Sequence, residues 1–216
     1  MNRPELSDLP FAAALTSHRG DLDDVDYDTV LFEQADFDSP NAANARFLEC
    51  AFRRVSIANG KLPRANLRGV WMRDVRLTGT SLAESGWLEV TVLGSSLAGV
   101  EVFGAALRRV TFSGCKLDSV NFRAAQLTDV VFEDCVLRDV DFAGATLVRC
   151  SFPESQLIRA DFSKVTMDKT DLRGAELGLI IDVQSLRGAI ISSGQLALVA
   201  PVLAETLGII IDDGTP

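Results

Sequence analysis

A large apolar residue occupies every fifth position from Leu22 to Leu177, with a single exception at Ala42. The series spans 32 pentads and contains no insertion or deletion. A period of five fits neither the 3.6 residues of a helical turn nor the two-residue alternation of an ordinary strand. The chain therefore contains an internal repeat, and this repeat constrains the fold more than any other feature.

A second column, made of small residues, lies two positions before each large residue. It contains nothing larger than valine apart from Pro40, and the residue between the two columns is usually polar, as in Ala-Asp-Phe-Ser-Lys at 160–164. Residues two apart point the same way in extended backbone, so both columns are predicted to face the interior. Because a pentad is too short for a complete strand and turn, we predict that it forms one side of a coil, with glycine and polar residues at the corners.

This unit resembles the repeat of the pentapeptide repeat family, whose motif is similar to A(D/N)LxG, as in Ala-Asn-Leu-Arg-Gly at 65–69. The resemblance covers residues 20–179. It implies an all-β solenoid, a right-handed quadrilateral β-helix with four pentads per coil and about eight coils in this chain. We expect three segments, which are an N-terminal cap or tail at 1–19, the β-helix at 20–179 and a C-terminal cap at 180–216.

The C-terminal segment is predicted to form a small α-helical cap. Ser192 or Ser193 can begin a short helix over 195–200, and Pro201 suits the first turn of a second helix that ends at Gly208. The segment has more apolar side chains than a lid over one coil needs, and such a surface usually covers a partner. We therefore expect a two-fold dimer, with a monomeric cap as the alternative. The expected dimer interface consists of Leu196, Val199, Val202, Leu203, Leu207, Ile209, Ile210 and Ile211.

Three short stretches of this segment, at 186–190, 195–196 and 207–208, read Leu-Arg-Gly-Ala-Ile, Gln-Leu and Leu-Gly. They resemble the tail of the dimeric actinobacterial quinolone-resistance branch of the family. That branch binds DNA gyrase, and its acidic rod is taken to imitate duplex DNA. The resemblance implies a homodimer that modulates DNA gyrase by DNA mimicry, takes part in antibiotic resistance and does not itself bind nucleic acid.

The net charge of −9 is unevenly distributed, which affects the choice of partner rather than the fold. Residues 21–38 contain eight acids and no base, whereas residues 41–110 contain ten Lys or Arg against five acids. Duplex DNA carries one charge about every 1.7 Å of its axis, so a mimic needs a sustained acidic stripe, which the basic middle interrupts. The candidate partner-binding acids lie in the first coils and are Asp21, Asp23, Asp24, Asp26 and Asp28.

The alternative function is that of a protein-interaction scaffold with an unrelated protein partner. Four bulky residues, two of them in the irregular stretch 85–96, are predicted to be exposed near the middle of the rod and flanked by arginines. They are Trp71, Leu88, Leu93 and Phe103. Exposed tryptophan next to arginine is typical of a binding hot spot. The competing interpretation is that these side chains simply cover the sides of the coils.

The sequence shows no arrangement typical of an enzyme. The single histidine, His18, is interpreted as a solvated residue of the N-terminal segment, and no Cys/His spacing for a metal or glycine-rich phosphate loop occurs. A uniform rod also lacks the concave pocket that catalysis usually requires. We therefore expect a non-enzymatic protein without a cofactor or a metal.

The four cysteines, Cys50, Cys115, Cys135 and Cys150, all fall in the small inward column and are interpreted as core fillers. Cys115 and Cys135 would lie in adjacent coils, so a disulfide is geometrically possible, but a cytosolic compartment favours reduced thiols. No apolar run reaches the roughly 18 residues of a membrane span, and the N-terminus is a poor signal peptide. We expect a cytoplasmic location.

Overall fold

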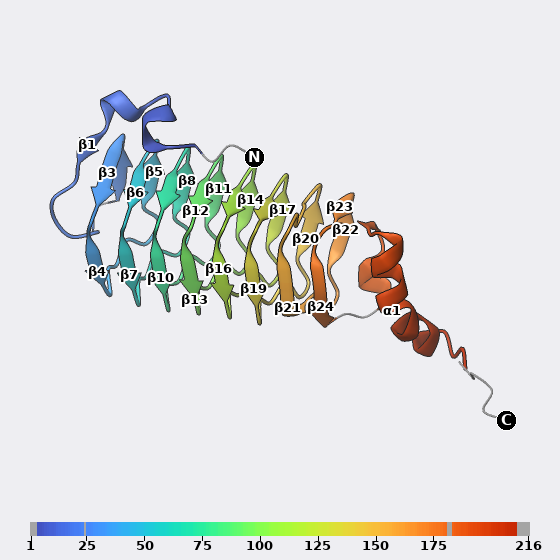
Figure 1. Cartoon of the computed structure of the whole chain (residues 1–216). Helices are drawn as coiled ribbons and strands as arrows, with labels where there is room; N and C mark the ends of the chain where they lie inside the picture. Colours follow the sequence, from blue (N-terminus) through green and yellow to red (C-terminus); the bar gives the residue numbers. More distant parts are fainter. Residues whose placement is uncertain (1–3, 24, 181–182, 211–216) are drawn as a thin grey trace.

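The structure is a computed structural model that describes residues 4–23, 25–180 and 183–210. The pentads wind into a four-sided β-solenoid of about eight coils, with one α-helix at the C-terminal end (Figure 1). This architecture confirms the fold class that the resemblance to the pentapeptide repeat family implies.

Three sides of the rod are parallel sheets whose strands come from successive coils. The first sheet contains β1 (Thr16–Ser17), β3 (Val30–Glu33), β6 (Ala51–Arg53), β9 (Trp71–Arg73), β12 (Thr91–Leu93), β15 (Thr111–Ser113) and β18 (Val131–Glu133). The second contains β2 (Asp26–Asp28), β5 (Arg46–Leu48), β8 (Asn66–Arg68), β11 (Gly86–Leu88), β14 (Ala106–Arg108), β17 (Gln126–Thr128), β20 (Thr146–Val148) and β22 (Thr166–Asp168). The third contains β4 (Asp36–Asp38), β7 (Ser56–Ala58), β10 (Arg76–Thr78), β13 (Ser96–Ala98), β16 (Lys116–Asp118), β19 (Val136–Arg138), β21 (Gln156–Asp161) and β24 (Glu176–Ile180).

The fourth side of the rod has no extended strands and is joined by single parallel bridges between coils. The bridged residues are Asn41, Lys61, Ser81, Glu101, Asn121, Asp141 and Asp161. Throughout the regular coils each residue pairs with the one 20 positions later, as Phe52 pairs with Met72. Like residues therefore stack on like, and the rings of Phe112, Phe132 and Phe152 follow one another at centroid distances of 4.9 and 5.0 Å.

The corners of the coils have a backbone conformation that the residue types at these positions do not predict. Every fifth residue from Thr29 to Gly174 has a φ between 51° and 80°, which is the left-handed region. Only eight of these positions hold glycine, so most corners place an L side chain where it costs about 1–2 kcal/mol. The cooperative ladders of the rod must offset this strain, because each corner is fixed by the strands on both sides of it.

Polar residues of the repeat have identifiable structural partners. Asp141 and Asp161, which stand between the two columns, each accept a hydrogen bond of 2.8 Å from the backbone N–H two residues later. In the small column, the Ser155 hydroxyl donates to the carbonyl of Phe132 at 2.8 Å, and the Thr170 hydroxyl donates to that of Leu147 at 3.0 Å. The repeat therefore selects Asp, Asn, Ser, Thr and Cys for local hydrogen bonding as well as for size.

The N-terminal end of the rod is closed by residues that precede the first coil. β1 pairs in parallel with β3 and so adds a strand to the first sheet at the N-terminal end of the rod, where it covers an edge that would otherwise be exposed. His18 lies half-buried with its ring 4.8 Å from that of Phe32 and 5.6 Å from that of Tyr27. The interpretation of His18 as a solvated residue was therefore wrong, because the aromatic top of the core offers it apolar contacts.

The C-terminal end departs from the repeat in register. After β24, the 3₁₀-helix η3 (Val183–Leu186) leads into β25 (Ala189–Ile190), which pairs with β23 (Thr170–Asp171). Thr170 pairs with Ala189, so this last turn is one residue shorter than the others. Gly188 is required here, because a Cβ at that position would lie 2.0 Å from the carbonyl oxygen of Met167.

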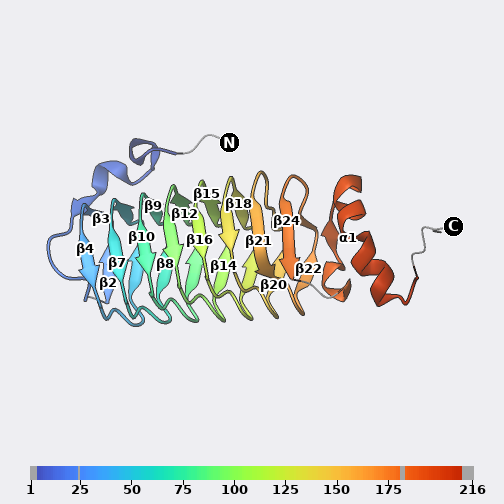
Figure 2. The same ribbon diagram turned by 60° about the horizontal axis from the view of Figure 1, so that its bottom comes forward.

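A single helix, α1 (Ser193–Thr206), follows and covers the end of the rod (Figures 1 and 2). Ser192 is its N-cap, as expected, but the predicted break into two helices at Pro201 was wrong. The fixed φ of proline is compatible with a helix, and the helix continues at the loss of one backbone hydrogen bond.

Candidate interaction surfaces

The N-terminal strap, defined as residues 4–17, lies against the outside of the first sheet (Figure 1). It contains the 3₁₀-helices η1 (Leu6–Asp8) and η2 (Ala12–Ala14) and ends in β1. Its three leucines, Leu6, Leu9 and Leu15, pack on an apolar stripe that consists of Leu31, Ala51, Trp71 and Leu93. We call this stripe the strap face, and it belongs to β3, β6, β9 and β12.

Trp71 and Leu93 are therefore not exposed, and the sequence prediction for these two residues was wrong. Trp71 does point outward from its coil, as the period requires, but only 1% of its surface remains accessible under the strap. Its indole N–H donates to the backbone carbonyl of Pro4 at 3.1 Å. Beside it, the guanidinium of Arg73 forms an ion pair with Glu5 of the strap. Residues 4–17 were expected to form a short helix or turn over the first coil, but the five-residue period does not indicate that they also run along the outside of the first sheet.

The other two residues of the predicted mid-rod patch lie on other sides of the rod. Leu88 belongs to β11 of the second sheet and is half-buried. Phe103 follows the bridge residue Glu101 on the fourth side, and 41% of its surface is exposed. The four residues therefore do not form one contiguous patch, because Trp71 and Leu93 lie on the first sheet, Leu88 on the second and Phe103 on the fourth side.

The acidic residues proposed for partner binding lie where the sequence places them, in the first coils. Asp21, Asp23, Asp26 and Asp28 are exposed, and Asp24 lies outside the described residues. Asp26 forms an ion pair with Arg46 of the next coil. A hollow of about 340 Å³ at this end of the rod is lined by carboxylates and by the edge of the core. Its lining residues are Asp21, Leu22, Asp23, Asp36, Phe37, Asp38, Ser39, Pro40 and Asn41.

Along the rest of the rod, many carboxylates are paired with arginines one coil away. Arg149 donates from Nε and Nη2 to the two oxygens of Asp129 at 2.6 and 2.7 Å, and Arg159 binds Asp139 in the same way. These hydrogen bonds lower the pKa of Asp129 and of Asp139. Glu89 is similarly paired with Arg109 at 2.8 Å. Along much of the rod, arginines therefore compensate the charge of neighbouring carboxylates, and no continuous acidic stripe results from these pairs.

The helix α1 is attached to the rod by one buried polar residue, Gln195. Its amide nitrogen donates to the carbonyls of Leu172 and Ala175 at 2.6 and 2.8 Å, and its amide oxygen accepts from the N–H of Ser192 at 2.9 Å. Both carbonyls belong to the last regular coil. Gln195 therefore caps the helix and the rod at the same time.

The outer surface of this helix is strongly apolar. Of the predicted interface residues, Val199 is buried against the rod and Leu203 is half-buried, whereas Ile211 lies outside the described residues. The remaining ones are exposed, namely Leu196, Val202, Leu207, Ile209 and Ile210, and Leu198 adds a further apolar side chain that is 70% exposed. Three of these residues lie on α1 and three follow it, and such a density of exposed aliphatic side chains is unusual for a surface that faces only water.

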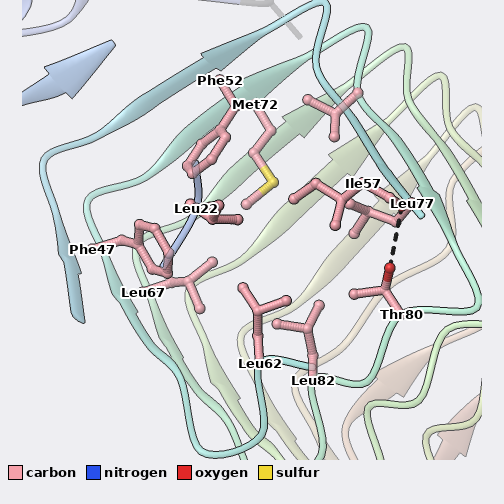
Figure 3. Close-up of a pocket in the computed structure, with 11 residues that line it drawn as sticks. Leu22, Phe47, Phe52, Ile57, Leu62, Leu67, Met72, Leu77, Thr80 and Leu82 are labelled. Carbon is pink, nitrogen blue, oxygen red and sulfur yellow. Dashed lines mark hydrogen bonds between the residues drawn. The ribbon is translucent and has the colours of Figure 1, made fainter. Parts of the chain in front are cut away.

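Inside the N-terminal part of the rod, residues between Leu22 and Leu82 enclose a small apolar void (Figure 3). Its volume is about 30 Å³, enough for roughly one methyl group or one water molecule. The only polar side chain in its lining is Thr80, whose hydroxyl donates to the carbonyl of Ile57 at 3.2 Å. The void is therefore a packing defect and does not have the size or the polar groups of a ligand site.

All four cysteines are buried in the core of the rod. Burial raises the pKa of Cys50 and of Cys150 to about 11. A hydrogen bond with the Cys115 side chain, together with burial, raises the pKa of Cys135. Among the described residues no group of three or more His, Cys, Asp or Glu side chains is placed to hold a metal ion. In the same part of the chain, no helix has the length and apolar character that crossing a membrane requires.

The fold, the five-residue period and the left-handed corners together define a four-sided β-solenoid that presents flat outer faces. The chain belongs to the pentapeptide repeat proteins. A family model described as a pentapeptide repeat region matches residues 105–180, and a model of pentapeptide repeats in eight copies matches residues 31–69. A search of curated protein sequences gives no significant match.

A comparison with solved structures gives one match in fold that covers nearly the whole chain. A trypsin-treated variant of QnrB1, a plasmid-mediated fluoroquinolone resistance protein, superposes with a TM-score of 0.51 at 14% identity, covering 91% of this chain and 96% of that one. A pentapeptide repeat protein from the thylakoid lumen of Arabidopsis thaliana gives a TM-score of 0.39 at 22% identity, over 41% and 62% of the two chains. HetL, a protein involved in heterocyst differentiation regulation from a Nostoc cyanobacterium, gives 0.26 at 18%, over 81% and 92%. The match to QnrB1 covers nearly the whole of both chains, so the two proteins share their fold over most of their length.

Proposed function

We propose that this chain is a non-enzymatic protein that binds a macromolecular partner in the cytoplasm and does not itself bind nucleic acid. The observation that supports this proposal most directly is the combination of a stiff rod with an apolar helix exposed at its end. Rods of stacked repeats present extended binding surfaces, and their outer side chains vary without disturbing the core.

DNA gyrase is the partner that we propose to test first. The fold is shared with a fluoroquinolone resistance protein over most of its length, and the first coils carry a surplus of exposed carboxylates. In this proposal the acidic end imitates the phosphates of a DNA segment, which links the chain to antibiotic resistance. The arginine pairs along the rod are the specific observation that favours the alternative, a scaffold for an unrelated protein partner.

A supercoiling assay separates the two candidates. Purified protein is titrated into DNA gyrase with relaxed plasmid, with and without a quinolone. DNA mimicry predicts inhibition or drug protection at micromolar concentrations, which Asp21→Asn/Asp23→Asn/Asp28→Asn weakens at least tenfold. A matched control, Asp118→Asn/Asp168→Asn, changes exposed carboxylates elsewhere on the rod and should have little effect. The absence of any effect of the wild type at these concentrations excludes gyrase and leaves the scaffold.

We further propose that α1 and the residues after it form a two-fold dimer interface. The exposed aliphatic side chains of this segment would then be covered by the same segment of a second copy. Light scattering of the full chain should give twice the monomer mass, and Val202→Asp/Leu207→Asp should give the monomer. The control Leu48→Asp introduces the same charge at an exposed leucine of β5. A monomeric wild type contradicts the dimer.

A further inference from the structure

The strap face differs in composition from the same positions of later coils. The stripe reads Leu31, Ala51 and Trp71 in one column, and the same column continues with Thr91, Thr111, Val131, Ser151 and Asp171, none of which is as large as tryptophan. An outward tryptophan in a repeat that usually places small or polar residues there requires a cover. In this structure the cover is the strap, which belongs to the same chain.

The strap is held more weakly than any part of the rod. Its two 3₁₀-helices have three residues each and contain no buried residue, and Phe11 is the only strap residue classed as buried. The ion pair between Glu5 and Arg73 is substantially exposed to solvent, so water screens it. The rod, in contrast, is held by parallel sheets on three sides and by bridges between successive coils on the fourth. Local opening is expected to begin where few apolar contacts are buried, which here is the strap.

The rod side of this contact has a defined chemistry. Three arginines, Arg53, Arg54 and Arg73, flank the stripe. The rod supplies two neighbouring carboxylates, because Glu33 pairs with Arg53 and Arg54, and Asp74 lies next to Arg73. The Nε atom of Arg53 is buried and has no hydrogen-bond partner among the described residues. A hollow of about 190 Å³ remains between the strap and the rod, and it is lined by Glu5, Leu6, Arg53, Arg54, Trp71, Arg73 and Asp74. Glu5 thus balances a local excess of positive charge, and the strap does not fill the space available.

We propose that the strap face is a docking surface for a protein partner and that the strap is its built-in competitor. The partner segment has the chemistry of the strap, which is a carboxylate followed by apolar side chains one and four residues later, as in Glu5, Leu6 and Leu9. Its carboxylate binds Arg73 and its apolar side chains cover Trp71. Tryptophan and arginine together form the kind of anchor that dominates binding energies. The inference rests on the proposal that the chain binds a protein, but it does not require that partner to be gyrase.

The test uses a fluorescent peptide with the sequence of residues 4–17 as the probe and the full chain as the receptor. In the release variant Leu6→Asp/Leu9→Asp the strap loses its apolar contacts while the strap face is unchanged. We expect the release variant to bind the peptide at least tenfold more tightly than the wild type, because the tethered strap of the wild type competes at a high effective concentration. A scrambled peptide should not bind.

Charge exchange shows whether the predicted groups make the contact. In the release background, Arg73→Glu should weaken binding at least tenfold, and a peptide with Glu5→Arg should restore it. The matched control Arg108→Glu changes an exposed arginine of the second sheet and should leave the affinity unchanged. Circular dichroism confirms that each variant keeps its fold.

Three results overturn the proposal. The first is a folded release variant that does not bind the peptide, and the second is binding that Arg73→Glu does not affect. The third is a strap that exchanges between two copies of the chain. It would be seen as a concentration-dependent dimer that disappears in the release variant, and it would mean that the strap face binds a second copy. None of these readouts contains gyrase, so a failed supercoiling assay and a failed peptide assay are independent of each other.

Discussion

The most informative single perturbation is the replacement of Gln195 by leucine, which is similar in size but cannot form hydrogen bonds. Gln195 uses both N–H groups and its oxygen in this structure, and two of its partners are the buried ends of the last coil, the carbonyls of Leu172 and Ala175. A net hydrogen bond contributes about 1 kcal/mol, and a buried carbonyl left without a donor adds about 1–3 kcal/mol. Gln195→Leu removes the donor from two carbonyls, and water can reach at least one of them once the helix loosens. We therefore expect the free energy that holds α1 to the rod to fall by about 2–4 kcal/mol.

Because the rod is a repeat structure, this loss should be local rather than global. Amide hydrogen exchange is therefore the appropriate assay, and the amides of β25 and of α1 should exchange about 30- to 1000-fold faster, which corresponds to the same free energies. The matched control Leu198→Ala changes a side chain of the same helix that is 70% exposed, and it should change exchange by less than threefold. If Gln195→Leu leaves the protection of these amides within threefold of the wild type, the assignment of Gln195 as the attachment point is wrong.

Three further perturbations test the packing, the corners and the ion pairs of the rod. Leu62→Phe adds volume next to the void of about 30 Å³. At about 24 cal/mol per Å³, filling the void should raise the free energy of unfolding, measured in urea, by about 0.7 kcal/mol. A loss of stability would mean that the coils cannot accommodate the ring. Ala124→Gly relieves a left-handed corner with a φ of 53°, so a net gain of about 0.5 kcal/mol is expected after the entropy of glycine is subtracted, while Ala106→Gly in β14 should be destabilising. The pKa of Asp129 is lowered by Arg149, so the pair stabilises the fold above the unfolded-state pKa of about 4, and this stability is lost as the pH falls through the lower folded-state pKa. Melting temperatures between pH 6 and pH 2 should therefore fall less steeply for Asp129→Asn than for the wild type, and parallel curves would contradict the assignment.

The candidate surfaces differ in how far the sequence could identify them. The acids of the first coils and the apolar C-terminal helix are visible as composition, and the structure exposes most of them. The mid-rod patch was not predictable, because it depends on which segment covers Trp71. One signal was present, since the outward apolar residues Leu31 and Trp71 occur in coils that a short apolar N-terminal segment can reach. That signal is visible only once the coils are assembled and the positions of their outer faces are known.

The sequence by itself indicated a coil with its large residues inside, because a strict period of five fits neither a helix nor an ordinary strand, and the resemblance to pentapeptide repeat proteins implied its four sides. It also offered Ser192 and Ser193 as the two candidates for the N-cap of the C-terminal helix, because hydroxyl side chains suit that position, and the structure uses Ser192. Only the tertiary structure decided that Trp71 is covered, that α1 continues through Pro201 and that Gln195 joins the helix to the rod. These features depend on contacts between residues up to 67 positions apart, and no periodic pattern encodes them. The repeat specifies the rod through local rules, whereas the covers at its ends and on its side are specified by shape and by buried polar groups that need a partner.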